Sequence, residues 1–281
     1  MSSPLTRVDK AKFGPWAIVT GSSSGIGREF ARQLAASGLN LVLVARRLDA
    51  LENLGHELAG RFGIEYRAVG LDLSAEGFLD QLAKSTRDLD IGLVVSNAGA
   101  ALSYTADMLE HDRDALHRMA RLNTVAHLDL AHYFGRRLAD RGRGGILLVS
   151  SLAGRQGAPG LADYAASKAF VLILGESLHI ELARVGVTVT VLLPGGTETD
   201  MVRSYGVDLD TVKRTMRPLR LMSVNQCVAE GLAALNHNRP TLIAGRSNRI
   251  ITRLIPRSAM TALMSSLRNK FAKALAVQRA A

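Results

Sequence analysis

The sequence is poor in several features, and each absence excludes a class of protein. A single cysteine, Cys227, among 281 residues leaves no internal disulfide and no cysteine-based metal cluster, which fits a reducing compartment. No uncharged apolar run approaches the ~18 residues of a membrane span, and the first residues lack the charged and apolar regions of a secretory signal. No proline- and glycine-rich linker divides the chain. We therefore expect a cytoplasmic protein built around one large domain.

Acidic residues are missing from the C-terminal end. Residues 231–281 hold nine lysines and arginines and no aspartate or glutamate, whereas the first 230 residues hold 26 basic and 25 acidic groups. The formal net charge of +10 therefore belongs to the C-terminus, and the rest of the chain is nearly neutral. A high isoelectric point is then no argument for a nucleic-acid partner, and we expect none.

Short apolar runs alternate with amphipathic segments along most of the chain. The apolar runs carry hydrophobic residues at consecutive positions, as strands buried on both faces of a parallel sheet do. Strands are predicted at Trp16–Thr20, Leu39–Ala45, Ile64–Gly70, Ile91–Ser96, Ile146–Ser150, Val187–Leu193 and Thr241–Ala244. Helices are predicted at about Gly27–Ser37, Asp49–Arg61, Ser74–Arg87, Asp112–Arg141, Ala162–Val185 and Val224–His237. The alternation predicts an α/β fold, a doubly wound seven-stranded parallel sheet with helices on both faces.

Tyr164 and Lys168 stand about one helical turn apart, so they can share a helix face. An isolated phenol loses its proton near pH ~10 and is a poor acid or base at neutral pH. A cation within a few Å stabilises the phenolate and lowers its pKa. With Ser151 thirteen residues upstream, the pair forms a minimal set for passing a proton to or from an alcohol oxygen.

A glycine- and serine-rich segment joins the first predicted strand to the first helix. Glycines let the backbone turn tightly and approach a pyrophosphate, which binds the free N–H groups of a helix N-terminus. A flexible serine–glycine turn is the alternative, but the strand–loop–helix context favours a dinucleotide site. The predicted contacts are Gly21, Ser22, Ser23, Ser24, Gly25, Ile26 and Gly27.

The glycine loop and the Tyr164-x-x-x-Lys168 pair together resemble the short-chain dehydrogenase/reductase family, from Pro15 to about Gly245. The segment Ser-Asn-Ala-Gly that begins at Ser96 is similar to the family's Asn-Asn-Ala-Gly, with serine in place of the first asparagine. The other matching positions are Asp72, Asn123, Ser151, the Pro194-Gly195 pair and Thr199. The resemblance implies a Rossmann-type fold and a nicotinamide dinucleotide cofactor.

The resemblance also implies a role for each matching residue. Tyr164 would be the catalytic acid in reduction, and Ser151 would hydrogen-bond the substrate carbonyl oxygen. Lys168 would bind the nicotinamide ribose hydroxyls and, together with the positive ring of the oxidised cofactor, lower the pKa of Tyr164. Asn123 would hold a water that links Lys168 to solvent. The remaining cofactor contacts would be Asp72 at adenine, Asn97 and Gly99 along the dinucleotide, and Pro194, Gly195 and Thr199 at the nicotinamide carboxamide. As purely structural residues, Ser151 would cap a strand and Asn123 would relieve a helix kink.

Two arginines, Arg46 and Arg47, end the second predicted strand, where NAD-dependent enzymes of this kind carry an acid that accepts bonds from the ribose 2′-hydroxyl. A carboxylate would repel a 2′-phosphate, whereas a guanidinium binds it through charge-assisted hydrogen bonds. No acid occurs between Leu39 and Leu48. The position favours NADP(H), with Arg46 as the main contact; the alternative is that the arginines cap exposed helix ends.

The segment Met201–Ser223 interrupts the alternation and is a candidate lid. Its five basic residues suit either an acidic substrate, such as a coenzyme A thioester or a carrier protein, or a solvated surface. Its apolar residues could line a pocket for a steroid, acyl or aromatic ketone. The basic residues are Arg203, Lys213, Arg214, Arg217 and Arg220.

Residues 246–281 form a predicted basic, amphipathic helical extension to a single domain of residues 1–245. Its apolar residues recur at helical spacing on one stripe. The stripe could lie on an anionic membrane, dock on a partner subunit, fold back over the substrate cleft, or pack as an ordinary terminal helix. Its members are Met260, Leu263, Met264, Leu267, Phe271 and Leu275.

The patterns together predict an NADPH-dependent oxidoreductase that moves a hydride between nicotinamide and an apolar ketone, aldehyde or secondary alcohol. The alternatives are a non-catalytic NADP(H) sensor or scaffold and a peripheral membrane module on the same fold. The seven histidines show no ligand spacing, so no metal site is predicted. The helices predicted at Asp112–Arg141 and Ala162–Val185 would pair in a homodimer or homotetramer.

Overall fold

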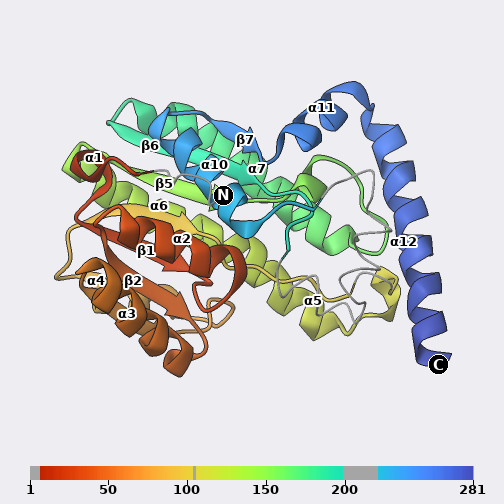
Figure 1. The fold of residues 1–281 in the computed structure, drawn as a ribbon, viewed down its shortest axis with the longest axis horizontal. Coiled ribbons are helices and arrows are strands. Elements are labelled where there is room, and N and C mark those ends of the chain that lie inside the picture. Colours follow the sequence, from red (N-terminus) through yellow and green to blue (C-terminus); the bar gives the residue numbers. More distant parts are fainter. Residues whose placement is uncertain (1–6, 104–105, 199–220, 281) are drawn as a thin grey trace.

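The computed structural model describes residues 7–103, 106–198 and 221–280, the last seven by their backbone alone. Its centre is one parallel sheet with the strand order β3-β2-β1-β4-β5-β6-β7 (Figure 1). The strands are β1 Trp16–Thr20, β2 Asn40–Ala45, β3 Tyr66–Gly70, β4 Ile91–Ser96, β5 Gly144–Val149, β6 Val187–Leu193 and β7 Thr241–Ile243. The predicted seven-stranded, doubly wound sheet of Rossmann type is confirmed, with small shifts in the strand ends.

Helices cover both faces of the sheet. Core contacts place α1 Lys10–Phe13, α2 Gly25–Ala36, α3 Leu48–Phe62 and α10 Val224–Asn236 on one face. They place α4 Phe78–Thr86, α6 Ala126–Arg141 and α7 Ala162–Ala183 on the other. The remaining long helices are α5 Arg113–Ala120, α11 Arg246–Leu254 and α12 Arg257–Ala280, and α12 runs along one edge of the molecule (Figure 1).

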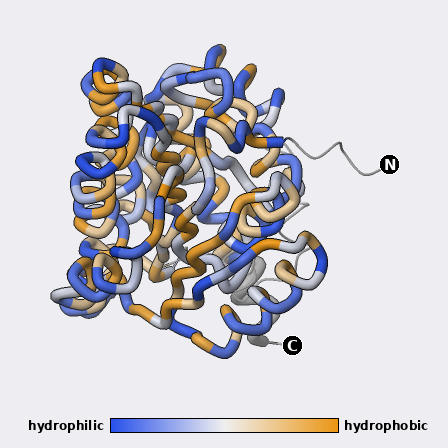
Figure 2. The backbone as a smooth tube through the Cα atoms, turned by 90° about the vertical axis from the view of Figure 1, so that its left-hand side faces the viewer, coloured by the Kyte–Doolittle hydropathy of each residue, from blue (hydrophilic) through white to orange (hydrophobic). Residues whose placement is uncertain are grey.

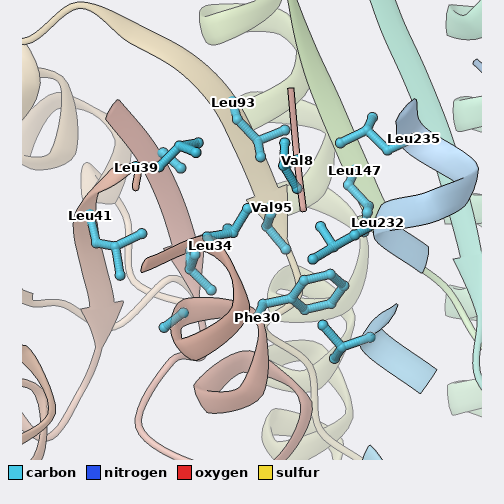
Figure 3. Packing of buried hydrophobic residues seen from close by; sticks show 14 of the residues in the cluster. Val8, Phe30, Leu34, Leu39, Leu41, Leu93, Val95, Leu147, Leu232 and Leu235 are labelled. Atoms are coloured by element: carbon cyan, nitrogen blue, oxygen red, sulfur yellow. The ribbon is translucent and has the colours of Figure 1, made fainter. Parts of the chain in front are cut away.

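The strands are buried on both faces, which is why their sequences are continuously apolar. Every residue of β4, β5 and β6 is buried. In Figure 2, hydrophobic segments of the backbone run through the interior of the molecule. On one face Phe30 of α2 and Leu232 of α10 pack against Leu147 of β5 (Figure 3). Because Phe30 is fully buried, replacing it with alanine would cost roughly 3–5 kcal/mol of stability.

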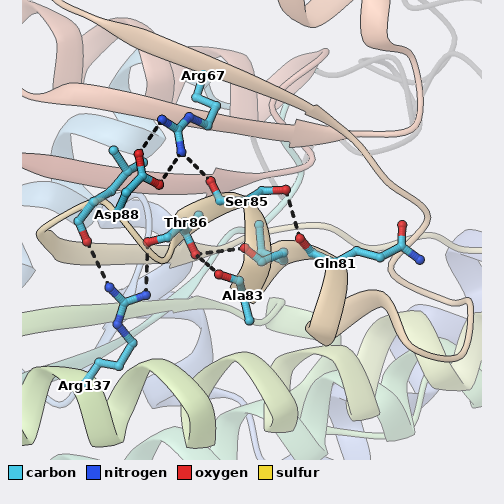
Figure 4. Close-up of polar contacts among 9 residues, drawn as sticks. Arg67, Gln81, Ala83, Ser85, Thr86, Asp88 and Arg137 are labelled. Carbon is cyan, nitrogen blue, oxygen red and sulfur yellow. Dashed lines mark hydrogen bonds and ion pairs between the residues drawn. The ribbon is translucent and has the colours of Figure 1, made fainter.

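Polar contacts fix the loop that leads into β4. The Arg67 guanidinium pairs with Asp88 and also donates to the Ser85 carbonyl oxygen, 2.7 Å away. From the opposite side, Arg137 of α6 donates to the carbonyl oxygens of Thr86 and Leu89 (Figure 4). These contacts tie the start of β4 to its neighbours, and the far end of the same strand leads into Asn97.

Two predicted helices are interrupted, each for a local reason. The helix expected at Asp112–Arg141 is divided by a π-helical turn at Arg121–Val125, where the Ala126 N–H bonds to the Arg121 carbonyl oxygen. The C-terminal extension, expected as one stripe, forms α11 and α12, because the residue before Pro256 is driven out of the helical region.

Candidate active site

The strand order reverses between β1 and β4, and a cleft of about 700 Å³ opens at the carboxyl ends of the strands there, as expected for this sheet topology. Most of the predicted site residues converge on it. Those that line the cleft are Gly21, Ser23, Ser24, Gly25, Ile26, Gly27, Arg46, Arg47, Asp72, Asn97, Gly99, Ser151, Tyr164, Lys168, Pro194 and Gly195.

The glycine loop forms one wall of the cleft, and two of its glycines are required by the geometry. Gly21 has a φ of +66°, which other residues rarely adopt. A Cβ at Gly27 would collide with the Gly21 carbonyl oxygen, so α2 can approach β1 this closely only with glycine there. The loop therefore presents the first N–H groups of α2 to the cleft, as a pyrophosphate site does.

Arg46 and Arg47 lie at the rim of the same cleft with exposed side chains. Arg47 reaches back to the Ser23 hydroxyl, 3.3 Å away. The pKa of Asp72 is lowered, first by its hydrogen bond from the Ser74 hydroxyl and also by the positive charge of Arg46. The arginines thus stand between the glycine loop and Asp72 with donors free to meet an anionic ligand.

The residues predicted to transfer a proton meet further along the cleft. Ser151 follows β5, and its Oγ accepts a hydrogen bond from the Ala153 N–H at 3.2 Å. Tyr164, in the first turn of α7, is half-buried and hydrogen-bonds to Ser151. The Lys168 Nζ lies 5.9 Å from the centre of the Tyr164 ring. The helical spacing therefore does place the tyrosine and the lysine on the same face of one helix.

Lys168 is held from several sides. It is 3% exposed, its Nζ donates to the Val149 carbonyl oxygen at 3.0 Å, and its own carbonyl oxygen accepts from the Ser150 hydroxyl at 2.6 Å. A Cβ at Gly99 would lie 2.9 Å from the Lys168 Nζ and 3.2 Å from the Asn123 Oδ1. A side chain at residue 99 would therefore crowd both Lys168 and Asn123.

Asn123 is fully buried in the π-helical turn and does not line the cleft. Its Oδ1 accepts from the Ala100 N–H at 2.9 Å, and its Nδ2 donates to the Ala100 carbonyl oxygen and to the Ser167 hydroxyl. It therefore clamps the loop after β4 to α7. The water-holding role that the resemblance implies stays a prediction.

Burial shifts the pKa values of both Tyr164 and Lys168 in the chain without a cofactor. Burial of the phenol raises the pKa of Tyr164, while the hydrogen bond with Ser151 acts in the opposite direction. Burial also lowers the pKa of Lys168 to about 8, because a charged ammonium loses its hydration. The depression of the tyrosine pKa by Lys168 together with an oxidised cofactor stays a prediction.

Of the other predicted contacts, Ser22 is not at the cleft and Thr199 lies outside the described residues. Ser22 is fully buried, and its hydroxyl and N–H both face the Val44 carbonyl oxygen, so its prediction as a cofactor contact is not supported by the geometry. Thr199 and nearly all of the candidate lid, Met201–Ser223, lie outside the described residues. Of that segment, Met222 is described and packs into the core.

Part of the apolar stripe of α12, among the residues whose side chains are described, faces the cleft rather than solvent. Met260, Met264 and Phe271 line the cleft, and Met260 and Phe271 are buried. Arg268 on the same helix pairs with Asp107, at 2.9 Å. Of the four arrangements open to the stripe, the structure has it folded back over the cleft. These stripe residues are therefore not available to a membrane surface.

Sequence reasoning missed Asn248 in α11, which lines the cleft beside Gly195 although its side chain is buried. A lone asparagine in a basic segment carried no motif that could have identified it. Across the described ranges, no group of three or more histidine, cysteine, aspartate or glutamate side chains is placed to hold a metal ion. No helix in the described part of the chain is long and apolar enough to cross a membrane.

The sequence matches the family model of short chain dehydrogenases over residues 15–210. It is 38% identical over 234 residues to a very-long-chain 3-oxoacyl-CoA reductase of Neurospora crassa. The matched region covers 82% of this chain and 68% of the reductase. A 7beta-hydroxysteroid dehydrogenase of Clostridium sardiniense is 31% identical over 241 residues, 85% of this chain and 89% of that one. Against the fungal reductases the chain spans 58% to 68% of their length.

The fold is similar to a solved short-chain dehydrogenase from Sphingobium yanoikuyae in complex with NADPH. The two structures superpose with a TM-score of 0.75 at 29% sequence identity, over 91% of this chain and 94% of that one. The likeness extends through nearly the whole of both chains.

Proposed function

Because the chain belongs to the short-chain dehydrogenase family, we propose that it is an NADPH-dependent oxidoreductase whose substrate is a bulky, apolar ketone. The observation that carries the proposal is the convergence of three features on one cleft. The glycine loop and Arg46 stand at one end, Ser151 and Tyr164 stand along its wall, and α12 adds an apolar side. The domain of residues 1–245 would bind the cofactor, and the extension of residues 246–281 would shape the substrate end.

The residues of the glycine loop fit a nicotinamide dinucleotide. A Cβ at Gly27 would collide with the Gly21 carbonyl oxygen, so glycine there permits the close packing of helix on strand that a dinucleotide-binding loop needs. The exposed guanidinium groups of Arg46 and Arg47 fit a 2′-phosphate better than a hydroxyl, because they offer charge-assisted donors to an anion. NADPH bound there would supply the hydride for the carbonyl carbon.

The chain's own residues would manage the proton and the developing negative charge. Ser151 and Tyr164 would both donate a hydrogen bond to the substrate carbonyl oxygen. Negative charge builds up on that oxygen as the hydride adds to the carbon and the C=O bond order falls. Tyr164 would then release its proton to that oxygen, and the Lys168 ammonium would stabilise the phenolate left behind. The raised pKa of Tyr164 keeps the phenol protonated at neutral pH, which is the form that reduction needs.

The cleft wall supports an apolar substrate with considerable bulk. Five large hydrophobic side chains line the cleft: Leu102, Met119, Met260, Met264 and Phe271. The names of the relatives state a very-long-chain 3-oxoacyl-CoA and a hydroxysteroid as their substrates, and both the acyl chain and the steroid nucleus are large and apolar. Hydrophobic linings with a few placed polar groups are typical of sites for such ligands.

A carbonyl panel tests the activity. Purified protein should oxidise NADPH with a long-chain 3-oxoacyl thioester or an oxosteroid much faster than with acetone. Tyr164→Phe should abolish that turnover and keep NADPH binding, whereas Tyr66→Phe, which removes a hydroxyl bound to Glu52, should behave as the wild type. Turnover by Tyr164→Phe at the wild-type rate would refute the assignment, and NADPH binding without turnover of any carbonyl would favour the sensor or scaffold.

The same panel tests the role of α12. Met264→Trp should narrow the cleft and lower kcat/KM for the large ketones more than for small ones. Asn269→Trp adds the same ring at an exposed position of α12. It should leave kcat/KM unchanged for large and for small ketones. Equal losses on large and small ketones would argue that α12 does not select the substrate.

A second copy of the chain is the proposed partner of α6 and α7. Large hydrophobic side chains are exposed there, Leu128 on α6 and Phe170, Ile173 and Ile180 on α7. Such a patch on two adjacent helices is typical of an interface between subunits. A homodimer or homotetramer in light scattering, dissociated by Ile173→Glu, is the expected result; a wild-type monomer would contradict it.

A further inference from the structure

The Gln156 side chain is a largely buried amide without a partner at the wall of the cleft. Gln156 follows η3 Leu152–Arg155, the short 3₁₀ helix that begins after Ser151, and it is 6% exposed. Within the described part of the chain, neither its Oε1 nor its Nε2 makes a hydrogen bond, and neither atom is sealed from solvent. Since Gln156 lines the cleft, a molecule in the cleft can reach this amide.

Gln156 lies at the end of the cleft that the proposed function gives to the substrate. Because a 3₁₀ helix rises ~2 Å per residue, the Cα atoms of Ser151 and Gln156 lie within roughly 10 Å of each other. The next residue, Gly157, adjoins α12, since a Cβ there would lie 3.3 Å from the Thr261 Cγ2. The loop then leads into α7, and its apolar residues pack against Tyr164. Gln156 thus stands between the residues proposed to move the proton and the helix proposed to shape the substrate end.

The amide of Gln156 is a polar group on an apolar stretch of the wall. The cleft-lining residues on either side of it in the sequence are Leu152, Ala153, Ala158 and Pro159. A desolvated amide is unfavourable until it gains a hydrogen-bond partner. A ketone with a single oxygen would leave the amide unpaired, because Ser151 and Tyr164 use that oxygen in the proposed reaction. A neutral amide cannot balance a buried charge, so the partner it suits best is a neutral oxygen.

We infer that Gln156 is a substrate-binding residue whose amide hydrogen-bonds a second, neutral oxygen of the ketone. The inference rests on the proposed function, because it assumes that a ketone is reduced beside Ser151 and Tyr164. The short path from Ser151 to Gln156 requires the second oxygen to lie only a few bonds from the reacting carbon. A 3-oxoacyl ester or thioester carries such an oxygen, whereas a ketone on a hydrocarbon chain does not. Gln156 would thereby select among the bulky apolar ketones that the cleft admits.

The test compares two substrates that differ only in the second oxygen. One is methyl 3-oxododecanoate, and the other is the ketone in which methylene groups replace its ester carbonyl and ester oxygen. The measured quantity is the ratio of kcat/KM for the ester to kcat/KM for the ketone, with NADPH. Gln156→Met keeps the length of the side chain and removes the amide, so the ratio should fall roughly 3- to 10-fold, as expected for one neutral hydrogen bond. The intrinsic difference in reactivity between the two substrates is the same for both proteins and cancels.

Two controls keep a binding role apart from a structural one. Gln81→Met makes the same replacement at an exposed position of α4, outside the cleft lining, and should keep the wild-type ratio. Thermal melting of Gln156→Met shows whether the variant is folded. An equal loss on both substrates would assign Gln156 a structural role and overturn the inference.

The remaining outcomes separate this inference from the proposed function. If the wild type reduces no carbonyl compound, the proposed function and this inference both fail. If the wild type reduces both substrates and Gln156→Met keeps the full ratio, the inference alone is overturned. Reduction of oxosteroids without reduction of the ester would also overturn it and leave the proposed function standing.

Discussion

The Ser96 hydroxyl and the His127 Nδ1 lie 2.7 Å apart in the core. The other ring nitrogen, Nε2, lies 3.2 Å from the Ala98 carbonyl oxygen, which can only accept, so Nε2 carries the proton and Ser96 donates to Nδ1. Burial lowers the pKa of His127 well below its usual value, which keeps the ring neutral. The serine that replaces the expected asparagine is thus one half of a buried pair that anchors the loop after β4.

We expect the Ser96–His127 pair to behave as a unit. Ser96→Ala alone, or His127→Leu alone, leaves a buried polar partner unsatisfied and should cost about 1–3 kcal/mol of stability. The double variant removes both polar groups and should cost less than the sum of the two single changes. Urea denaturation of the four proteins measures the coupling, and strictly additive losses would contradict it.

Cofactor preference should depend on Arg46. Arg46→Ala removes charge-assisted donors, worth about 1.5–3 kcal/mol each, so the affinity for NADPH should fall roughly 10- to 100-fold while the affinity for NADH changes little. Arg28→Ala removes an equal charge from α2, where Arg28 pairs with Glu57. Fluorescence titration of both variants decides the point: equal losses for NADPH and NADH in Arg46→Ala would be evidence against 2′-phosphate recognition.

The stability contribution of Lys168 should vary with alkaline pH. Its folded pKa of about 8 lies below its ordinary value of 10.5, so between these values the unfolded chain binds more protons and stability rises with pH. The difference in unfolding free energy between the wild type and Lys168→Met should therefore grow in favour of the wild type from pH ~8 to ~10. Burial also raises the pKa values of Tyr164 and Cys227. Both groups titrate in both proteins, so their contributions cancel in the difference in unfolding free energy. A constant difference would show that the ammonium is not desolvated.

Gly99 should be intolerant of even one methyl group. In Gly99→Ala the new Cβ would press on the Lys168 Nζ and the Asn123 Oδ1, and we expect kcat to fall at least about tenfold because a displaced ammonium stabilises the Tyr164 phenolate less well. Gly60→Ala is the matched control. Its Cβ would meet nothing within 4 Å, and alanine inside α3 should raise stability by about 0.5–1 kcal/mol. Steady-state rates of Gly99→Ala equal to wild type would refute the steric argument.

Local patterns were sufficient for the frame of the fold and for most of the site. Continuous apolar runs predict buried parallel strands, because only a strand covered on both faces needs no polar alternation. The glycine loop and Arg46 were identifiable because each follows a predicted strand directly. The Tyr164–Lys168 pair needed only the helical repeat, since both residues stand on one helix.

Other features depended on contacts between distant segments. Ser22 belongs to the glycine loop by sequence, yet its hydroxyl turns toward Val44 of β2. The break in the long helix forms where Asn123 bonds to Ala100. Ala100 lies in the loop after β4, outside the sequence pattern that predicts the helix. No periodicity could predict either arrangement.

The sequence by itself therefore determined the sheet, the dinucleotide loop and the proton-transfer pair, because each depends on residues that are neighbours along one strand, turn or helix. The tertiary structure alone decided what the C-terminal stripe covers, that desolvation raises the pKa of Tyr164, and that Asn248 lies behind Gly195. Burial and shape complementarity arise only when segments far apart in the chain pack together, so they leave no periodic signal in the sequence.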